Sequence, residues 1–349
     1  MTAPPTRPVL GVDLSAFARN LRAVRSRVSP AQLMLVVKDD AYGHGVRPIV
    51  QAAHAEGVRW IGAFDVATAL TVRSELGPGP RVFSWLVFGR DDADDAAEAG
   101  LDVGVGDVQV LEETAAAARR RGVRTRVHLK IDTGLHRNGI RPEDWPAVLA
   151  RVQRLQTEGL IELVGVWSHI SEASDADDDD ARAAFERAVP VSGAAPVLRH
   201  LAASAASFAR PEFRYDLVRV GAFCYGIRSA GGPTEASLGI ERVAALDAPV
   251  TEVRADDRAI VAIGALHGLP STLAGRVEIT TPAGPRRLVE VGALSCVVEG
   301  WAGAWPGQCV RVYGPGARSV TDLAEAIDTI GEEIAVRLSP LIERRYLRS

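Results

Sequence analysis

Short apolar runs alternate with amphipathic stretches from the start of the chain to about residue 230. The runs have the length of buried strands, and the stretches between them carry apolar residues at helical spacing. We expect strands at 33–37, 59–64, 81–87, 101–105, 124–131, 160–169, 197–201 and 217–221. We expect helices at 46–55, 66–75, 91–99, 107–121, 143–157 and 178–189, with a short helix after Ser204. An alternation of about eight strand–helix units predicts a parallel sheet closed into a TIM-like (β/α)8 barrel.

The pattern changes near residue 235, where the regular alternation of strand and helix ends. Beyond it, apolar and polar residues alternate between glycine and proline punctuation, which is typical of strands joined by turns. We expect strands at 250–253, 259–263, 275–280, 288–291 and 309–313, a helix at 320–330 and a final strand at 334–338. The sequence therefore predicts an α/β chain with a barrel domain over 1–235 and a mostly β domain over 236–349.

The composition excludes several classes of protein. A formal net charge of −4 offers no excess of positive charge to nucleic acid or to acidic membranes. Three widely spaced cysteines suggest neither a disulfide framework nor a zinc site, and the acidic run 177–180 is better explained as the start of a solvated helix than as a metal site. No apolar run could span a bilayer and no signal peptide is visible, so we expect a cytoplasmic protein without metal, nucleic acid or membrane partners.

Reactive side chains fall at the ends of five of the predicted strands, namely Lys38, Lys130, Asp132, His169, His200 and Arg219. In a parallel barrel the catalytic side chains lie at the carboxyl ends of the strands. A lysine at the end of an apolar strand loses contact with water, which favours its neutral, nucleophilic form. The alternative for Lys38 is a lysine whose ammonium group reaches water at the barrel rim.

Five segments, in order along the chain, resemble the signatures of the alanine racemases, which are fold-type III enzymes that use pyridoxal 5'-phosphate (PLP). The first is Val36-Val-Lys-Asp-Asp-Ala-Tyr-Gly-His-Gly45, and the second is His128-Leu-Lys-Ile-Asp-Thr-Gly-Leu-His-Arg-Asn-Gly-Ile140. The others are Ser168-His-Ile170, His200-Leu-Ala-Ala-Ser-Ala-Ala206 and Tyr215-Asp-Leu-Val-Arg-Val-Gly-Ala-Phe-Cys-Tyr-Gly226. Together these segments are spread over most of the first domain.

The resemblance implies how the chain holds its cofactor. Lys38 would carry PLP and act as the base on one face of the substrate. Tyr42 and Ser204 would bind the cofactor phosphate, together with the backbone at Gly221 and with Tyr225. A helix that begins at Ser204 after a late barrel strand is a suitable place for an anion. Tyr225 has an alternative interpretation as a packed core aromatic.

The resemblance also implies roles around the cofactor ring. Arg219 would face the pyridine nitrogen, and because an arginine keeps its proton, the nitrogen would stay unprotonated and proton transfer would be favoured over transamination. Arg137 would reach the cofactor's phenolic oxygen and the substrate carboxylate. Lys130 would orient Arg137, and the matching lysine of the family is often carbamylated. His169 would support Arg219 and His200 would line the pocket, although both are also compatible with hydrogen-bonded core histidines.

The resemblance fails on the substrate side. Racemisation by two bases needs an acid–base group on each face of the substrate, and in alanine racemases the second group is a tyrosine from the partner's β domain. No tyrosine lies between Tyr225 and Tyr313, and 253–260 runs straight into the next strand. The family's Ile-Gly-Tyr-Ala-Asp-Gly is Ile263-Gly-Ala-Leu-His-Gly268 here, its Cys-Met-Asp is Ser295-Cys-Val297, and Pro340 replaces a phosphate-binding tyrosine.

His267 and Cys296 are the candidates for a replacement acid–base group. A histidine suits proton transfer near neutral pH, although His267 could equally be a surface-loop residue. Cys296 is more simply explained as a small buried apolar residue. His54 and His128 are assigned no role.

Three functions are compatible with these observations. The first is a PLP-dependent amino-acid racemase or epimerase that acts on alanine or a larger amino acid. The second is a PLP-dependent decarboxylase or lyase on the same scaffold, since one remaining base suits chemistry on one face. The third is a PLP-binding protein without catalysis. The family forms head-to-tail homodimers, so the resemblance also implies a homodimer, in which each β domain covers the partner's barrel.

Overall fold

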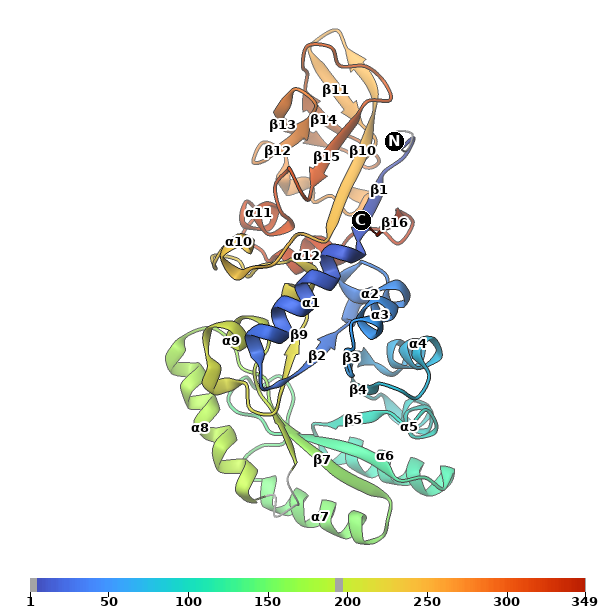
Figure 1. Cartoon of the computed structure of the whole chain (residues 1–349), viewed down its shortest axis with the longest axis vertical. Coiled ribbons are helices and arrows are strands. Elements are labelled where there is room, and N and C mark those ends of the chain that lie inside the picture. Colours follow the sequence, from blue (N-terminus) through green and yellow to red (C-terminus); the bar gives the residue numbers. More distant parts are fainter. Residues whose placement is uncertain (1–4, 192–196, 349) are drawn as a thin grey trace. The chain divides into compact units, whose positions relative to one another are not determined.

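The computed structural model describes residues 5–191 and 197–348 of the chain (Figure 1). The chain divides into two compact units. We call the first, Val24–Lys38 and Val50–Gly221, the barrel unit. We call the second, Met1–Ala23, Asp39–Ile49 and Ala222–Ser349, the sheet unit. The predicted domain boundary between residues 235 and 236 remains a prediction.

Eight parallel strands form the sheet of the barrel unit. They are β2 (Gln32–Val36), β3 (Trp60–Asp65), β4 (Arg81–Leu86), β5 (Asp102–Val105), β6 (Thr125–Lys130), β7 (Ile161–Trp167), β8 (Leu198–His200) and β9 (Leu217–Val220). Neighbours follow one another from β2 to β8, and β9 pairs with β2. Asp216 N–H donates to Arg199 O, and Arg219 N–H donates to Ala202 O, both at 3.1 Å. Because these bonds join β9 to the chain at β8, the sheet closes, and the predicted (β/α)8 barrel is confirmed.

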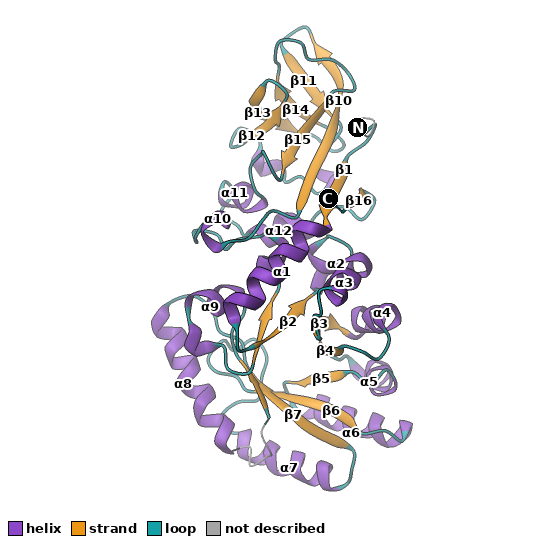
Figure 2. Cartoon of the chain, in the orientation of Figure 1, coloured by secondary structure: helices purple, strands orange, loops and turns teal. Residues whose placement is uncertain are grey.

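Helices lie outside the strands of this unit (Figure 2). They include α4 (Val66–Leu76), α5 (Gly89–Glu98), α6 (Val108–Arg121), α7 (Trp145–Thr157), α8 (Asp175–Val191) and α9 (Ser204–Ala209), with the short 3-10 helix η1 (Pro211–Phe213). Aspartates begin two of them: Asp65 accepts from Thr68 N–H at 2.7 Å, and Asp107 accepts from Val110 N–H at 2.8 Å. Each helix predicted for this part of the sequence is present.

Large side chains fill the interior of the barrel. A cluster of buried residues consists of Met34, Trp60, Phe83, Trp167 and Leu217. The rings of Phe83 and Trp167 meet edge to face, with centroids 5.3 Å apart. The barrel is therefore a packed core, and functional side chains are confined to the ends of its strands.

The sheet unit contains a second, mostly antiparallel sheet. Its strands are β1 (Val9–Asp13), β10 (Ala244–Arg254), β11 (Arg258–Val261), β12 (Glu278–Thr281), β13 (Gly284–Val291), β14 (Cys296–Glu299), β15 (Cys309–Tyr313) and β16 (Glu343–Leu347). β1 pairs antiparallel with β10 and parallel with β16. Shorter elements are α2 (Lys38–Tyr42), η2 (Ala222–Tyr225), α10 (Glu235–Leu238), η3 (Ala265–His267), η4 (Ser271–Leu273), α11 (Val320–Glu325) and α12 (Gly331–Val336). The predicted C-terminal β-rich region is present.

Some elements differ from the expectation. The strand predicted at 334–338 is wrong, because α12 occupies this place and the last strand is β16. The apolar spacing of this short run fits a helix as well as a strand, and Glu332 and Glu333 in the first turn favour the helix. β1, β14 and α1 (Leu14–Val28) were not predicted. α1 and α3 (Val46–Ala55) each contain residues of both units.

Candidate active site

The segment that follows Lys38 has an unusual backbone. The φ angles of Asp39, Asp40, Ala41 and Tyr42 are 53° or 54°, so these residues make a left-handed turn. Such a conformation costs roughly 1–2 kcal/mol per residue for L-amino acids. Gly43 N–H donates to Asp39 O at 2.9 Å, and the Asp40 carboxylate accepts from Val46 N–H at 2.9 Å, which holds the turn. Strain of this kind persists where the surrounding structure holds it, and it is concentrated at functional sites.

Lys38 and Lys130 are the only two lysines in the sequence. The other positions of its 40 lysines and arginines are all arginine. Arginine supplies a positive charge equally well, but it cannot act as a nucleophilic amine. Lys38 and Lys130 therefore carry the only two side-chain amines of the sequence that could act as nucleophiles. Both lysines belong to the barrel unit, where Lys38 is half-buried and Lys130 is buried.

Four cationic side chains of the barrel unit act electrostatically on His169, and Arg219 also contacts it directly. The pKa of His169 is lowered to about 3, first by burial and then by the charges of Arg219, Arg137, Lys130 and Lys38. The pKa of Lys130 is lowered to about 8, by burial and then by Arg137 and Arg219. The four predicted cations of this unit thus act on one histidine, and their excess of positive charge suits a ligand with anionic groups.

Arg219 is held by a dense set of hydrogen bonds. Its Nη1 donates to His200 O at 2.9 Å and to His200 Nδ1 at 3.2 Å. Its Nη2 donates to Ser168 O at 2.7 Å, Leu201 O at 2.9 Å and His169 Nδ1 at 3.2 Å. These bonds use all four hydrogens of the two Nη atoms, and Nε–H has no hydrogen-bond partner in the part of the chain that the structure describes. Nε–H is the donor that remains for a ligand.

The indole ring of Trp167 supports this cluster from one side. Lys130 Nζ lies 4.8 Å from the ring centroid, and Arg219 Cζ lies 5.1 Å from it. The ring of His200 stacks on the same indole, with centroids 5.7 Å apart and planes inclined by 4°. Trp167 therefore stabilises both cations and limits where they can move.

Ser204 and Gly221 meet at the ends of β8 and β9. The Ser204 hydroxyl accepts from Gly221 N–H at 3.3 Å. Ser204 begins α9, and Ala206 N–H in the same turn donates to the carboxylate of Glu172 at 3.1 Å. This turn already binds one anionic group of the chain, which agrees with the expectation that the start of α9 can bind an anion.

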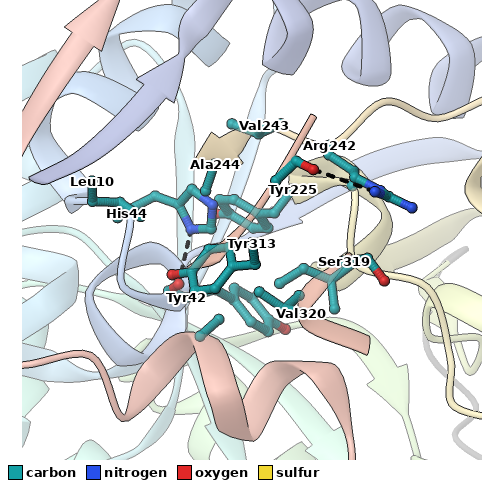
Figure 3. Close-up of a pocket in the computed structure, with 14 residues that line it drawn as sticks. Leu10, Tyr42, His44, Tyr225, Arg242, Val243, Ala244, Tyr313, Ser319 and Val320 are labelled. Carbon is teal, nitrogen blue, oxygen red and sulfur yellow. Dashed lines mark hydrogen bonds between the residues drawn. The ribbon is translucent and has the colours of Figure 1, made fainter. Parts of the chain in front are cut away.

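Tyr42 and Tyr225 lie together in the sheet unit (Figure 3). Their ring centroids are 4.8 Å apart, and the ring of His44 lies 5.0 Å from that of Tyr225. His44 Nδ1 donates to Tyr42 O at 2.8 Å, as the dashed line in Figure 3 shows. Tyr225 is fully buried in this aromatic cluster, which agrees with its interpretation as a packed aromatic and leaves its cofactor role a prediction. The cluster borders a cavity of about 20 Å³ that Tyr313 also lines.

His267 and Cys296 also belong to the sheet unit. His267 Nδ1 accepts from Gly264 N–H at 3.1 Å and closes η3, so the ring proton must lie on Nε2. Cys296 is buried in β14, and burial raises the pKa of its thiol to about 12. β10 and β11 are joined by a tight turn, with Arg254 paired to Arg258. No additional segment is therefore inserted between these two strands.

His128 and Asp102 are the polar residues that sequence reasoning missed. His128 Nδ1 lies 2.9 Å from His200 Nε2, and His128 Nε2 lies 3.3 Å from the Asp102 carboxylate. One signal was available for His128, because it stands two residues before Lys130 and side chains alternate along a strand. Asp102 offered no such signal, since its partners come from other strands.

Comparison with known proteins agrees with this geometry. Residues 12–229, more than half of the chain, match the family model described as alanine racemase, N-terminal domain. The alanine racemase of Thermobifida fusca is 35% identical, over 96% of this chain and 96% of the relative. The chain belongs to the alanine racemase family. The alanine racemase of Streptomyces coelicolor, another family member, is 32% identical over 96% of this chain and 95% of the relative.

Solved structures of this family share the fold. The crystal structure of alanine racemase from Streptomyces lavendulae superimposes with a TM-score of 0.93 at 32% identity, over 99% of this chain and 98% of that one. The alanine racemase of Bartonella henselae, solved with covalently bound pyridoxal phosphate, has a TM-score of 0.88 at 21% identity over 98% of this chain and all of that one. The relatives in this alanine racemase family support a racemase, an enzyme of the isomerase class, over a decarboxylase, a lyase or a protein without catalysis.

Proposed function

We propose that this chain is a PLP-dependent alanine racemase that binds its cofactor through Lys38. The observation that carries the proposal is that Arg219 contacts His169 and shares the Trp167 indole with Lys130, in a chain whose only other lysine is Lys38. The charges of Lys38 and Arg137 act on His169 as well. PLP presents anionic phosphate and phenolate groups and a pyridine nitrogen that accepts a hydrogen bond. The cationic cluster and the available Nε–H of Arg219 fit those groups.

The residues of the chain divide the work of holding the cofactor. Ser204 and the backbone N–H of Gly221, which are hydrogen-bonded to each other, would bind the phosphate. Burial and the neighbouring Arg137 lower the pKa of Arg219 to about 9, which still leaves it a cation at neutral pH. Its Nε–H would therefore donate to the pyridine nitrogen without transferring the proton. His169 and His200 support Arg219 through their Nδ1 atoms.

When bound, PLP supplies an electron sink that makes the Cα–H of the amino acid acidic. Lys38 would take the proton from Cα on one face and return it. Arg137 is exposed and would bind the substrate carboxylate, with Lys130 beside it to set its orientation. The packed aromatic core below the strand ends excludes water from that side of the site.

The proton donor on the opposite face is a separate part of the proposal. Because His267 Nδ1 accepts from Gly264 N–H, Nε2 is the ring atom that would exchange a proton with the substrate. The Cys296 thiol stays protonated at neutral pH and is buried, which makes it a poor acid–base group. We therefore propose His267 as the second group. Unchanged turnover in His267→Ala would reject it, and water would then be the remaining donor.

We further propose a head-to-tail homodimer as the active form. Leu266, Leu294 and Leu341 of the sheet unit are 69%, 63% and 89% exposed. Hydrogen bonds from Leu266 N–H to Ala293 O and from Ser339 N–H to His267 O bring their segments together. An apolar group of this kind beside His267 suits burial against a second copy of the chain.

Proton NMR of the PLP-loaded protein with L- or D-alanine in D2O, followed by chiral analysis, tests the activity. We expect loss of the Cα–H signal and conversion of either enantiomer to a mixture, both absent in Lys38→Ala. Borohydride trapping should attach the cofactor to the peptide that contains Lys38 and not to the one that contains Lys130. Exchange without inversion would contradict a racemase, and release of carbon dioxide would indicate a decarboxylase.

A further inference from the structure

A buried carboxylate of the barrel unit has no part in the proposed binding of the cofactor. Asp102, at the start of β5, has a fully buried side chain. It accepts from Arg81 Nε at 2.8 Å and also from Arg81 Nη2, and it accepts from Arg126 Nε at 3.2 Å. Burial favours the protonated acid, but the bonds from Arg81 and His128 outweigh this effect and lower the pKa of Asp102. Asp102 is thus an anion that can only accept hydrogen bonds.

The anionic state of Asp102 determines where the proton of His128 lies. Burial lowers the pKa of His128 despite the nearby carboxylate, so its ring is neutral and carries one hydrogen. Because Asp102 can only accept, that hydrogen is on Nε2, 3.3 Å from the carboxylate oxygen. His128 Nδ1 is then bare and acts as an acceptor.

The bare Nδ1 of His128 in turn determines where the proton of His200 lies. His200 Nε2 must donate to the bare His128 Nδ1 across 2.9 Å. Burial, His128 and Arg219 hold the pKa of His200 well below its usual value, so its Nδ1 is also bare. That atom accepts from Arg219 Nη1 at 3.2 Å. All donors in the chain of bonds point toward Asp102, and the opposite arrangement would place N–H against N–H at Arg219.

We propose that Asp102 and His128 are positioning residues that fix the tautomer of His200 and thereby hold Arg219 with only its Nε–H available to a ligand. We call Asp102, His128 and His200 the histidine relay. Its effect on the reaction rests on the proposed function of Arg219, whereas its tautomers do not. Trp167 Nε1 donates to His128 O at 3.2 Å, which also ties the relay to the cation-supporting indole.

The relay predicts how Asp102→Asn would act. The amide oxygen would stay with Arg81 and Arg126, and its NH2 group would face His128 Nε2 as a donor. His128 would then carry its hydrogen on Nδ1, and His200 would be forced to carry its hydrogen on Nδ1 as well. Arg219 Nη1 would lose its acceptor on the His200 ring and would turn. An asparagine that replaces a tautomer-fixing aspartate acts in this way in the serine protease triad.

Nitrogen-15 NMR of histidine-labelled full-length protein tests the relay directly, with and without PLP. Single histidine-to-glutamine variants assign the ring signals. In the unmodified protein we expect His128 and His200 to be neutral and protonated on Nε2 in both forms. In Asp102→Asn we expect both tautomers to be reversed. Protonation of either ring on Nδ1 in the unmodified protein would overturn the proposal, and this result does not depend on the variant folding.

Asp94→Asn is the matched control. Asp94 is another buried aspartate of the barrel unit and accepts from Arg120 Nε at 2.9 Å, but no hydrogen bond or ion pair joins it to a histidine within the described ranges. We expect its tautomers to match those of the unmodified protein. We expect kcat to fall roughly tenfold to a hundredfold in Asp102→Asn, the range seen for supporting partners in metal sites. KM should change little, and the absorption band of bound PLP should shift.

The outcomes separate the relay from the proposed function. Relay tautomers in a protein without racemase activity would leave the relay in place and reject the function. Racemase activity with different tautomers would reject the relay alone. Reversed tautomers in Asp102→Asn without a change in kcat or in the PLP band would reject the influence of the relay on Arg219.

Discussion

At the scale of single residues, the orientation of each side chain in the site depends on how many hydrogen bonds it can donate and accept. Arg219 can only donate, and acceptors on His200, Ser168, Leu201 and His169 use the hydrogens of both Nη atoms. A lysine in its place would have too few hydrogens for the same carbonyls and rings. Arg219 is therefore held in one orientation by these neighbours.

The neutral His169 should make the folded protein sensitive to acid. Its pKa is about 3 in the folded state, against about 6.5 in an unfolded chain. The stabilising contribution of neutral His169 is thus complete above pH 6.5 and is lost as the pH falls toward 3, where the unfolded chain takes up the proton first. Urea titrations of the cofactor-free protein across this range should show a shallower loss of stability in His169→Asn.

The exposed His54 provides the control for this measurement. His54→Asn also removes one histidine but leaves His169 and its cationic neighbours in place, so it shows whether the effect belongs to His169. An acid profile of His169→Asn identical to that of the unmodified protein would contradict a neutral His169.

Lys130 should react with carbon dioxide. With its pKa lowered to about 8, about half of the amine is neutral at pH 8 and can attack carbon dioxide, releasing a proton and leaving a carbamate. The carbamate is an anion beside Arg137 and Arg219, so it should be favoured there. Carbon-13 bicarbonate should give one carbonyl NMR signal that persists in Lys38→Ala and disappears in Lys130→Ala. A signal that survives in Lys130→Ala would contradict this assignment.

At the scale of elements, the left-handed turn after Lys38 carries a cost that a substitution should reveal. The side chain of Asp39 is exposed, and its φ of 53° disfavours a Cβ atom. Asp39→Gly should therefore raise the free energy of unfolding by about 0.5–1 kcal/mol, and Asp39→Val should lower it, as measured in urea.

Replacement of an aspartate by glycine in a right-handed helix should instead lower the free energy of unfolding. Asp95 is exposed in the middle of α5, so Asp95→Gly should destabilise the protein. Equal stability of the glycine and valine variants at Asp39 would show that the turn is not left-handed.

The elements of the barrel could be predicted from the sequence because each one has its own local period. Strands such as β6 and helices such as α3 lie where the apolar spacing places them. The left-handed turn could not be predicted, because residues 39–42 contain no glycine, the residue that usually adopts positive φ angles. β1 was missed because its partners β10 and β16 are more than two hundred residues away. The histidine relay was missed for a related reason, since barrel closure alone brings β5, β6, β8 and β9 together.

At the scale of the whole molecule, the five segments that resemble the family signatures lie before residue 227, and the departures from the family lie beyond it. No helix of residues 5–191 and 197–348 is long and apolar enough to cross a membrane. Ala265 and His267 stand where a tyrosine and an aspartate of the family's Ile-Gly-Tyr-Ala-Asp-Gly run would be, next to the exposed Leu266. If a second copy covers this surface, the residues that replace the family tyrosine are also the residues that contact the partner. The assembly state is therefore a direct test of how the altered side works.

Charges placed on this surface should separate the proposed dimer. Burial of a leucine contributes about 1.5–3 kcal/mol, and a buried unpaired carboxylate costs more than that. The double variant Leu266→Asp with Leu341→Asp should therefore be monomeric at micromolar concentration in light scattering, where the unmodified chain should have the mass of a dimer. Val123→Asp places the same charge on an exposed apolar residue after α6 and should remain dimeric. Racemase activity should fall together with the dimer, because the partner would supply the second face of the site. A monomeric unmodified chain with full activity would contradict both the dimer and the assignment of His267 to the partner's site.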